Sequence, residues 1–239
     1  MLVVASDRSD LAKVQLYLAL LDTATGKLAA AGKIAVGPGE GYGICMVKPV
    51  GAEGIAAFSA PKGGTIYRTL ISEANGAFTG TTTTLAQVPT QTEGCIADPR
   101  TGTLYIGEED AGIWAVDTAT GAKRMVAPID NKVLVADVEG LAIAPQGRDG
   151  GYLVASSQGD NAYAVFRLPD VTPVGRFRIA KGTFGSTEKT DGIELDNRDF
   201  GPDFPKGLFI AQDGMNAPAA QNFKYVRWDA ILAALGEGK

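Results

Sequence analysis

The chain has 239 residues, a net charge of −5 and a hydrophobic fraction of 45%, which favours one folded domain over residues 1–239 rather than disorder. It has no basic run, no apolar stretch long enough for a membrane span and only two cysteines, so we expect no nucleic-acid partner, no membrane association and no zinc site. The absence of histidine excludes Ser-His-Asp, Cys-His and histidine-nucleophile enzymes and leaves oxygen ligands, which suit Ca²⁺ or Mg²⁺, for any metal.

The first predicted strands lie in MLVVASD and VQLYLALL, and the turn LDTATGKL follows at 21–28. They match the second and third strands of the repeat that begins further along the chain, so the first strand of that repeat is missing. Charged residues come too early in MLVVASDRSD for the apolar core of a signal peptide, and we expect none in this chain.

A motif of one polar residue, glycine and an apolar run recurs about every fifty residues, a period typical of repeat folds. It occurs as GYGICMV at 41–47, TEGCIAD at 92–98, VEGLAIA at 138–144 and TDGIELD at 190–196. Each copy is followed by a second apolar run that ends in a polar loop: IAAFSAPKGG, LYIGEEDAG, YLVASSQGDN and LFIAQDGMN. Third and fourth runs follow, as in AYAVFRL and VGRFRIA.

These short runs are rich in β-branched and aromatic residues and are separated by Gly, Asp and Asn, which predicts antiparallel strands. Four strands per repeat are typical of a β-propeller blade, so we predict an all-β propeller of four-stranded antiparallel blades, about four and a half in this chain. The first strands would line a central channel. A two-sheet sandwich is the alternative. The C-terminal YVRWDAILAALGEGK predicts a strand followed by a short amphipathic helix.

The polar residues of the motif, Tyr42, Glu93, Glu139 and Asp191, would form a ring at one mouth of the channel. The loops after the second strands add a second set: Lys62, Glu108, Glu109, Asp110, Gln158, Asp160, Gln212, Asp213 and Asn216. The stretch ADVEG adds Asp137 beside Glu139. Close carboxylates repel one another unless protons or cations neutralise them, and Ca²⁺ is bound by many oxygen ligands. The pattern predicts a site for several Ca²⁺ ions, with isolated solvated turn acids as the alternative.

A platform of Ca²⁺ ions would attract an anion with many oxygens. Arg8 and Lys62 lie in equivalent loops, ASDRSD and SAPKGG. Both could contact phosphate directly, Arg8 through a bidentate fork. Taken alone, each is explained as well by an exposed surface charge.

Several long segments together resemble the β-propeller phytases: QTEGCIADPRTGTLYIGEEDAGIW, ADVEGLAI, GYLVASSQGDNAYAVF, TDGIEL, FPKGLFIAQDGMNAP and QNFKYVRW. The resemblance extends from Leu2 to the C-terminus. It implies a six-bladed propeller that binds several Ca²⁺ ions and hydrolyses phosphomonoesters of phytate (myo-inositol hexakisphosphate) with metal-activated water, as a 3-phytase-type phosphoric monoester hydrolase. It also implies a secreted or periplasmic monomer.

The resemblance carries roles to individual residues. Calcium ligands would be Tyr42, Glu93, Glu109, Asp137, Glu139, Gln158, Asp191, Asp213 and Asn216. Arg8, Tyr42 and Lys62 would contact phosphate, and with Glu93 and Glu139 they form the expected catalytic set.

The chain also departs from the family pattern. Phe184 or Gly185 stands where relatives carry an acid, and Met215 is unusual in the AQDG loop. The first blade and a half of the family, with its secretion signal, is not in this chain. The open strand edges that this leaves would favour self-association.

The two cysteines lie on the first strands of consecutive repeats. Cys45 is two residues after Gly43, whereas Cys95 directly follows Gly94, so they have opposite parity on strands whose side chains alternate. Their side chains would point either toward each other or apart. A disulfide and two buried thiols therefore both stay open.

Two other functions compete with phytate hydrolysis. One is a lactonase-type propeller with a single central Ca²⁺, which needs fewer acids. The other is a phytase-like propeller that binds calcium or a phosphorylated ligand without turnover. Release of phosphate distinguishes both from a phytase.

Overall fold

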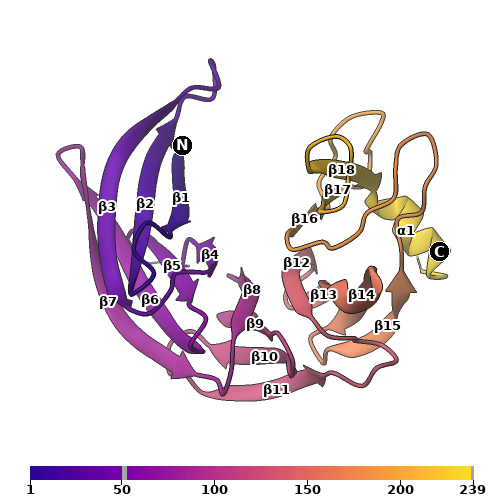
Figure 1. The fold of residues 1–239 in the computed structure, drawn as a ribbon, viewed down its shortest axis with the longest axis horizontal. Helices are drawn as coiled ribbons and strands as arrows, with labels where there is room; N and C mark the ends of the chain where they lie inside the picture. Colours follow the sequence, from indigo (N-terminus) through magenta and orange to yellow (C-terminus); the bar gives the residue numbers. More distant parts are fainter. Residues whose placement is uncertain (50–52, 238–239) are drawn as a thin grey trace. The chain divides into compact units, whose positions relative to one another are not determined.

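The computed structural model describes residues 1–49 and 53–237, and the regular structure in this part of the chain is almost entirely β-strand (Figure 1). Five sheets follow one another along the described sequence, each built from strands that are consecutive in the chain. Neighbouring strands of the first, second, fourth and fifth sheets run antiparallel. None of the described helices has the length and apolarity needed to cross a membrane.

The strands of the five sheets have the following bounds. The first sheet contains β1 (Leu2–Asp7), β2 (Lys13–Leu21) and β3 (Leu28–Pro38), and the second contains β4 (Gly43–Val47), β5 (Ile55–Ala60), β6 (Thr65–Ala74) and β7 (Ala77–Gln87). The third contains β8 (Thr92–Asp98), β9 (Thr103–Glu108), β10 (Gly112–Asp117) and β11 (Lys123–Pro128). The fourth contains β12 (Val138–Gln146), β13 (Gly150–Ser157), β14 (Ala162–Leu168) and β15 (Thr172–Phe177), and the fifth contains β16 (Ile193–Asp196), β17 (Leu208–Asp213) and β18 (Asn222–Arg227).

The predicted all-β class and the blade-like order of strands are confirmed, but the count of four and a half blades is wrong. The described residues form five sheets, of which the first and the fifth have three strands. In the fifth sheet the helix α1 (Trp228–Ala234) begins directly after β18. Trp228 and Ile231 lie about one helical turn apart and are only 2% and 5% exposed. The segment therefore buries its apolar side as a helix instead of forming a fourth strand.

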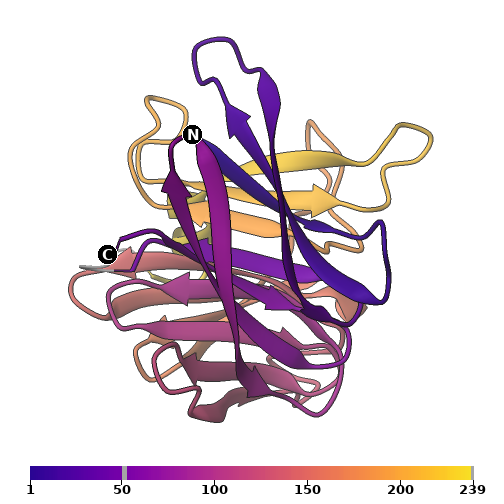
Figure 2. The ribbon, with the colours of Figure 1, turned by 90° about the vertical axis from the view of Figure 1, so that its left-hand side faces the viewer.

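The chain forms two compact units: unit 1 is Met1–Leu104 with Val116–Lys123, and unit 2 is Tyr105–Ala115 with Arg124–Lys239. In unit 1, whose strands face the viewer in Figure 2, a core joins the first two sheets: Leu16, Leu18, Ile34, Ala57 and Ile71. In unit 2, a core joins the fourth and fifth sheets and α1, and its buried aromatic side chains are Tyr152, Tyr163, Phe209 and Trp228. The single domain over residues 1–239 stays a prediction.

Two turns with the same sequence fold in the same way. In LDTATG and VDTATG, the carboxylates of Asp22 and Asp117 accept the backbone N–H groups of the residues two positions later, at 2.9 and 3.0 Å. Threonine hydroxyls add further bonds. Together these hydrogen bonds lower the pKa of both aspartates. Gly26 and Gly121 close the turns at φ of +70° and +74°, a conformation that favours glycine.

Candidate functional site

The glycine of the repeated motif allows neighbouring first strands to approach closely. A Cβ atom on Gly43 would overlap the carbonyl oxygen of Glu93. A Cβ atom on Gly140 would lie 2.8 Å from the carbonyl oxygen of Asp191, which accepts a hydrogen bond from the Gly140 N–H. In both cases the glycine of one repeat touches the polar residue of the next. The motif thus places polar side chains from consecutive repeats close to one another.

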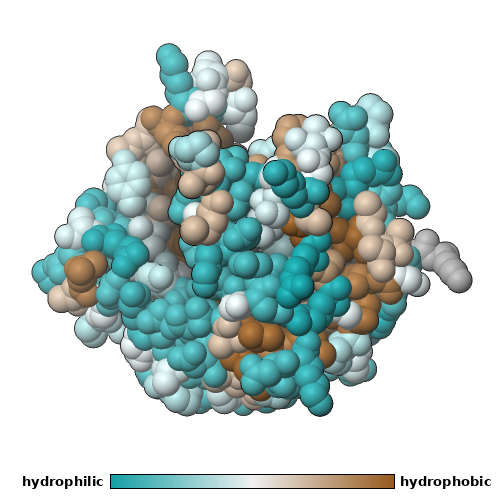
Figure 3. Space-filling model, turned by 45° about the vertical axis from the view of Figure 1, so that its right-hand side comes forward, coloured by the Kyte–Doolittle hydropathy of each residue, from teal (hydrophilic) through white to brown (hydrophobic). Residues whose placement is uncertain are grey.

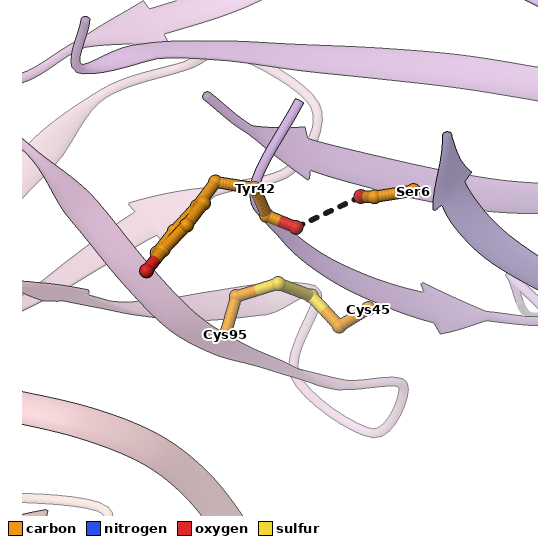
Figure 4. Close-up of a disulfide and its surroundings, with 4 residues drawn as sticks. All are labelled: Ser6, Tyr42, Cys45 and Cys95. Atoms are coloured by element: carbon orange, nitrogen blue, oxygen red, sulfur yellow. Dashed lines mark hydrogen bonds between the residues drawn. A yellow bond between two sulfur atoms is a disulfide. The ribbon is translucent and has the colours of Figure 1, made fainter. Parts of the chain in front are cut away.

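The cysteines form a disulfide, so the open question about them is resolved. Cys45 on β4 and Cys95 on β8 have Cα atoms 5.6 Å apart and are bonded through their sulfur atoms (Figure 4). Figure 4 also shows Tyr42 directly before β4, where its carbonyl oxygen accepts the hydroxyl of Ser6 at 2.8 Å. Opposite parity on facing strands brings the two side chains together.

In unit 1, four residues form what we term the cation–tyrosine cluster: Arg8, Glu40, Tyr42 and Lys62. The Arg8 guanidinium carbon and the Lys62 ammonium lie 4.8 and 4.7 Å from the centre of the Tyr42 ring. Both distances suit cation–π attraction. Arg8 also pairs with Glu40, and the Lys62 nitrogen lies 3.8 Å from the same Glu40 oxygen. Arg8 and Lys62, expected to act together, are therefore brought together, with side chains 47% and 36% exposed.

Two further acids of unit 1 lie in or beside the repeated motif: Glu40 and Glu93. Glu40 was missed in the sequence, although it precedes Tyr42 by two positions in the EGYG stretch. Glu93 lies on β8, is 5% exposed and accepts a hydrogen bond from the Gln91 side-chain amide. A buried carboxylate so close to the start of its strand is an unusual use of a charged residue. The position favours a ligand role over a solvated turn acid.

In unit 2, five residues form what we term the acid–amide cluster: Glu109, Asp137, Glu139, Gln158 and Asp191. Glu109 directly follows β9, whereas Glu139 lies on β12 and is only 8% exposed. The Val138 N–H donates to the Glu109 carbonyl at 3.0 Å, and carboxylate oxygens of Glu109 and Glu139 lie within 4.8 Å of each other. Two close carboxylates, one of them buried, favour neutralisation by a cation.

The other members of the acid–amide cluster are linked to one another by hydrogen bonds. The Gln158 N–H donates to the Asp137 carbonyl at 2.9 Å, and the Gln158 side-chain amide donates to the Asp191 carboxylate at 2.8 Å. The Asp191 N–H in turn donates to the Gln212 side chain at 2.9 Å. These residues come from three successive sheets or their loops, as the repeat predicted. Each supplies oxygen atoms, the donors that Ca²⁺ prefers.

Asp213 and Asn216 lie in a different environment. Asp213 is buried and pairs with the Lys224 ammonium at 3.0 Å, with side chains 4% and 11% exposed. Its carboxylate also accepts the N–H groups of Glu188 and Met215. Burial raises the pKa of Asp213, but the hydrogen bonds from Lys224 and the backbone outweigh it and the pKa is lowered overall. The Asn216 amide donates to the Ala220 carbonyl at 2.7 Å.

Two acids of the predicted second set have structural partners. Glu108 is 1% exposed and accepts the indole N–H of Trp114 at 2.8 Å. Asp160 accepts hydrogen bonds from Arg176 at 2.6 Å and from Arg178 at 3.1 Å. Lys224 and these arginines carried no signal in the sequence. Their roles depend on strand pairing that a single sequence does not reveal.

The positions at which the chain departs from the family pattern carry exposed apolar side chains. Phe184 and Met215 are 77% and 62% exposed. Phe184 lines a groove of about 790 Å³ together with Asn216, Phe223 and Tyr225. Apolar atoms reach the surface in several places on the face shown in Figure 3. Neither departure places a carboxylate where the family is expected to have one.

Comparisons with known proteins identify the family of this chain. The family described as Phytase matches residues 2–239. A 3-phytase of Bacillus subtilis (strain 168) is 40% identical over 179 residues, which cover 70% of this chain and 46% of the relative. The chain thus spans about half the length of this curated relative.

A solved structure supports the fold alone. A chain of the structure titled "Crystal Structure of Mitotic Checkpoint Complex" matches 90% of this chain and 57% of its own length, with a TM-score of 0.55 and 12% identity. Identity this low carries no information on activity. The family assignment rests instead on the match over nearly the whole sequence and on the related 3-phytase. The chain belongs to the phytase family.

Proposed function

We propose that this chain is a Ca²⁺-dependent phosphomonoesterase that hydrolyses phytate. The observation that carries the proposal is the pair of carboxylates from Glu109 and Glu139, which lie within 4.8 Å of each other in a chain of the phytase family. Such a pair requires a neutralising cation or a shared proton. A cation beside it also gives a net acidic chain the means to attract a polyanion.

The donors of the acid–amide cluster fit Ca²⁺. They are carboxylates, a side-chain amide and backbone carbonyls, and the chain has no histidine to favour a transition metal. Bound Ca²⁺ would supply charge neutralisation for the phosphoryl group and would activate a water molecule. We assign Glu109, Asp137, Glu139, Gln158 and Asp191 to hold it.

The remaining predicted ligands fall into two groups. Tyr42 and Glu93, the polar residues of the first two motifs, are proposed as further ligands because they occupy positions equivalent to Glu139 and Asp191 in the repeat. Asp213 and Asn216 stay predictions. Asp213 already has the Lys224 ammonium as a partner.

Arg8 and Lys62 would bind the phosphate. Their cationic groups lie against the Tyr42 ring, which limits their freedom before substrate arrives. Both side chains are partly exposed and can therefore meet an anion from solvent. They would offset charge on the phosphoryl oxygens as the phosphorus–oxygen bond breaks.

We also propose that the protein works outside the reducing cytosol, in the periplasm or in the secreted fraction. The Cys45–Cys95 disulfide supports this location, because such bonds persist in oxidising compartments. A monomer is the expected state for the family.

The test is release of inorganic phosphate from calcium phytate by the purified chain. The assay compares buffer with calcium, buffer with a calcium chelator, and the chelated sample after calcium is restored. We expect release in the first and third conditions and none in the second. Release that is indifferent to the chelator would overturn the calcium dependence.

Binding without turnover is tested beside the phosphate assay, because the chain covers only 46% of the related 3-phytase. Calcium binding with no phosphate release would identify a phytase-like binding protein. Hydrolysis of a lactone without phosphate release would identify the lactonase type.

A further inference from the structure

We infer that Tyr163 is a positioning residue that acts through Thr190 to fix Asp191 in the acid–amide cluster before any cation arrives. The inference deepens the proposed function and rests on its calcium site. It concerns a residue whose hydroxyl meets Thr190, the neighbour of a proposed ligand. The contacts that carry it all lie within unit 2.

The Tyr163 ring is held in place by two other rings. It lies on β14, is 1% exposed, stacks on Phe177 with ring centres 5.0 Å apart and meets Phe209 edge-on at 5.2 Å. Phe177 and Phe209 also contact each other at 5.4 Å. A ring packed on two sides has little freedom to rotate. Its hydroxyl is therefore delivered to a fixed point.

That hydroxyl meets two buried threonines. It lies 2.8 Å from the hydroxyl of Thr187 and 2.8 Å from that of Thr190. Both threonines are 3% exposed. A tyrosine hydroxyl can donate to one partner while accepting from the other, so one group satisfies both side chains. Their burial makes the loss of this partner costly.

Thr190 is the residue before Asp191. Its carbonyl oxygen accepts the Ser156 hydroxyl at 2.7 Å, so both its side chain and its backbone are held. The adjoining Asp191 then makes three further bonds: its N–H donates to Gln212, its carbonyl accepts from Gly140, and its carboxylate accepts from Gln158. The direction of the Asp191 carboxylate thus depends on where Thr190 is anchored.

The loop needs such an anchor because it has little structure of its own. Residues 178–192 join β15 to β16 without a helix or strand. A segment of this kind retains large conformational freedom unless tertiary contacts remove it. Side chains behind a metal ligand commonly set its orientation and raise metal affinity. Tyr163 can orient Asp191 in this way through its hydrogen bond to Thr190.

The test uses Tyr163→Phe, with Tyr152→Phe as its matched control. Tyr152 lies on the adjacent strand β13 and donates to Glu237 at 2.9 Å, so its variant also loses one tyrosine hydroxyl of the same sheet. Calcium affinity is measured by isothermal titration calorimetry. We expect roughly 10-fold weaker calcium binding for Tyr163→Phe and wild-type binding for Tyr152→Phe.

A second readout needs no calcium. Amide hydrogen exchange of Asp191, whose N–H donates to Gln212, is compared in calcium-free wild type and Tyr163→Phe. We expect faster exchange in the variant because the loop opens more often. Thr190→Val should reproduce both effects. Thr190→Ser, which keeps the hydroxyl, should restore them toward wild type.

The outcomes separate this inference from the proposed function. Unchanged calcium affinity and unchanged Asp191 exchange in Tyr163→Phe would overturn the inference, as would equal losses of calcium affinity in Tyr163→Phe and Tyr152→Phe. If the wild type itself binds no calcium, the proposed function fails, and the exchange comparison still decides whether Tyr163 holds Asp191. If Tyr163→Phe does not fold, Thr190→Val and Thr190→Ser decide.

Discussion

The cation–tyrosine cluster of unit 1 and the acid–amide cluster of unit 2 are built from equivalent parts of the repeat but compensate charge differently. Tyr42 and Glu139 occupy the same position of the motif. Around Tyr42 the cations of Arg8 and Lys62 meet a carboxylate and an aromatic ring. Around Glu139 a carboxylate lies close to another carboxylate. The first arrangement brings opposite charges together, whereas two close carboxylates favour an added cation.

Asp213 is a buried acid that is neutralised by a cation of the same chain, the Lys224 ammonium. It ends β17 as Glu108 ends β9, and the Lys224 ammonium neutralises it within the same sheet. No metal is required there to explain the buried carboxylate. The contrast with Glu109 and Glu139 suggests which acids of the repeat serve structure and which serve a ligand.

The largest expected effect follows from Glu139→Gln, which removes one of the two close carboxylates while preserving shape. We expect calcium-dependent phosphate release to fall below detection, because the variant removes the negative charge of the buried carboxylate of the pair. Phosphate release is measured from calcium phytate, with folding checked by circular dichroism. Glu237→Gln, which removes an acid paired with Arg167 instead, should retain activity. Wild-type activity in Glu139→Gln would show that the pair is not the metal site.

Removal of the Lys224 ammonium should lower the free energy of unfolding and leave the calcium affinity unchanged. Lys224→Met leaves Asp213 buried without its partner, and we expect a loss of about 3 kcal/mol in the free energy of unfolding. Arg198→Met breaks an exposed pair with Asp196, in which the arginine side chain is 78% exposed, and should cost about 0–1 kcal/mol. Both are measured by urea denaturation. Equal losses of unfolding free energy in the two variants would contradict the expected difference between the buried and the exposed ion pair.

The cation–tyrosine cluster should affect substrate binding more than metal binding. Arg8→Gln leaves a shorter polar side chain without the charge and the fork, so we expect a roughly 10-fold higher KM for phytate. The calcium affinity of the acid–amide cluster should not change. Arg198→Gln is the matched control on an exposed arginine. Steady-state kinetics at fixed calcium give the answer, and an unchanged KM would reduce Arg8 to a surface charge.

The smallest predicted effect is a pH dependence. The pKa of Asp213 is lowered from its ordinary value of 3.8, so the folded state favours the charged carboxylate. Its contribution to stability is therefore complete above that value and is lost as the pH falls below it. We expect the stability difference between wild type and Lys224→Met to shrink as the pH falls from 7 to 3. A constant difference would contradict the pairing.

Much of the fold could be predicted because the repeat carries it. The polar–glycine motif located β4, β8, β12 and β16, and the glycines explain the close contact of Gly43 with Glu93 and of Gly140 with Asp191. The first sheet, which contains three strands in the described residues, begins with β1 in MLVVASD as predicted. The blade count was wrong because Leu28–Pro38 forms a third strand, β3, so the first sheet is more than half a blade. The C-terminal helix that follows β18 was predicted.

The candidate site was predicted less completely. Repeat position was enough to bring Glu109 and Glu139 together and to pair Arg8 with Lys62 against Tyr42. It gave no information on counter-charges, since Glu40 and Lys224 lie outside the motif. The partners of Tyr163 also could not be read from the sequence, because Thr187 and Thr190 belong to an irregular loop.

The most direct test of the central claim is calcium titration of the calcium-free chain by isothermal calorimetry. Wild type, the double variant Glu109→Gln/Glu139→Gln, and Glu73→Gln, which changes an acid of an exposed turn, are compared under the same conditions. The account predicts saturable calcium binding by wild type and by Glu73→Gln, and its loss in the double variant. Binding that persists unchanged in the double variant, or no binding by wild type, would contradict it.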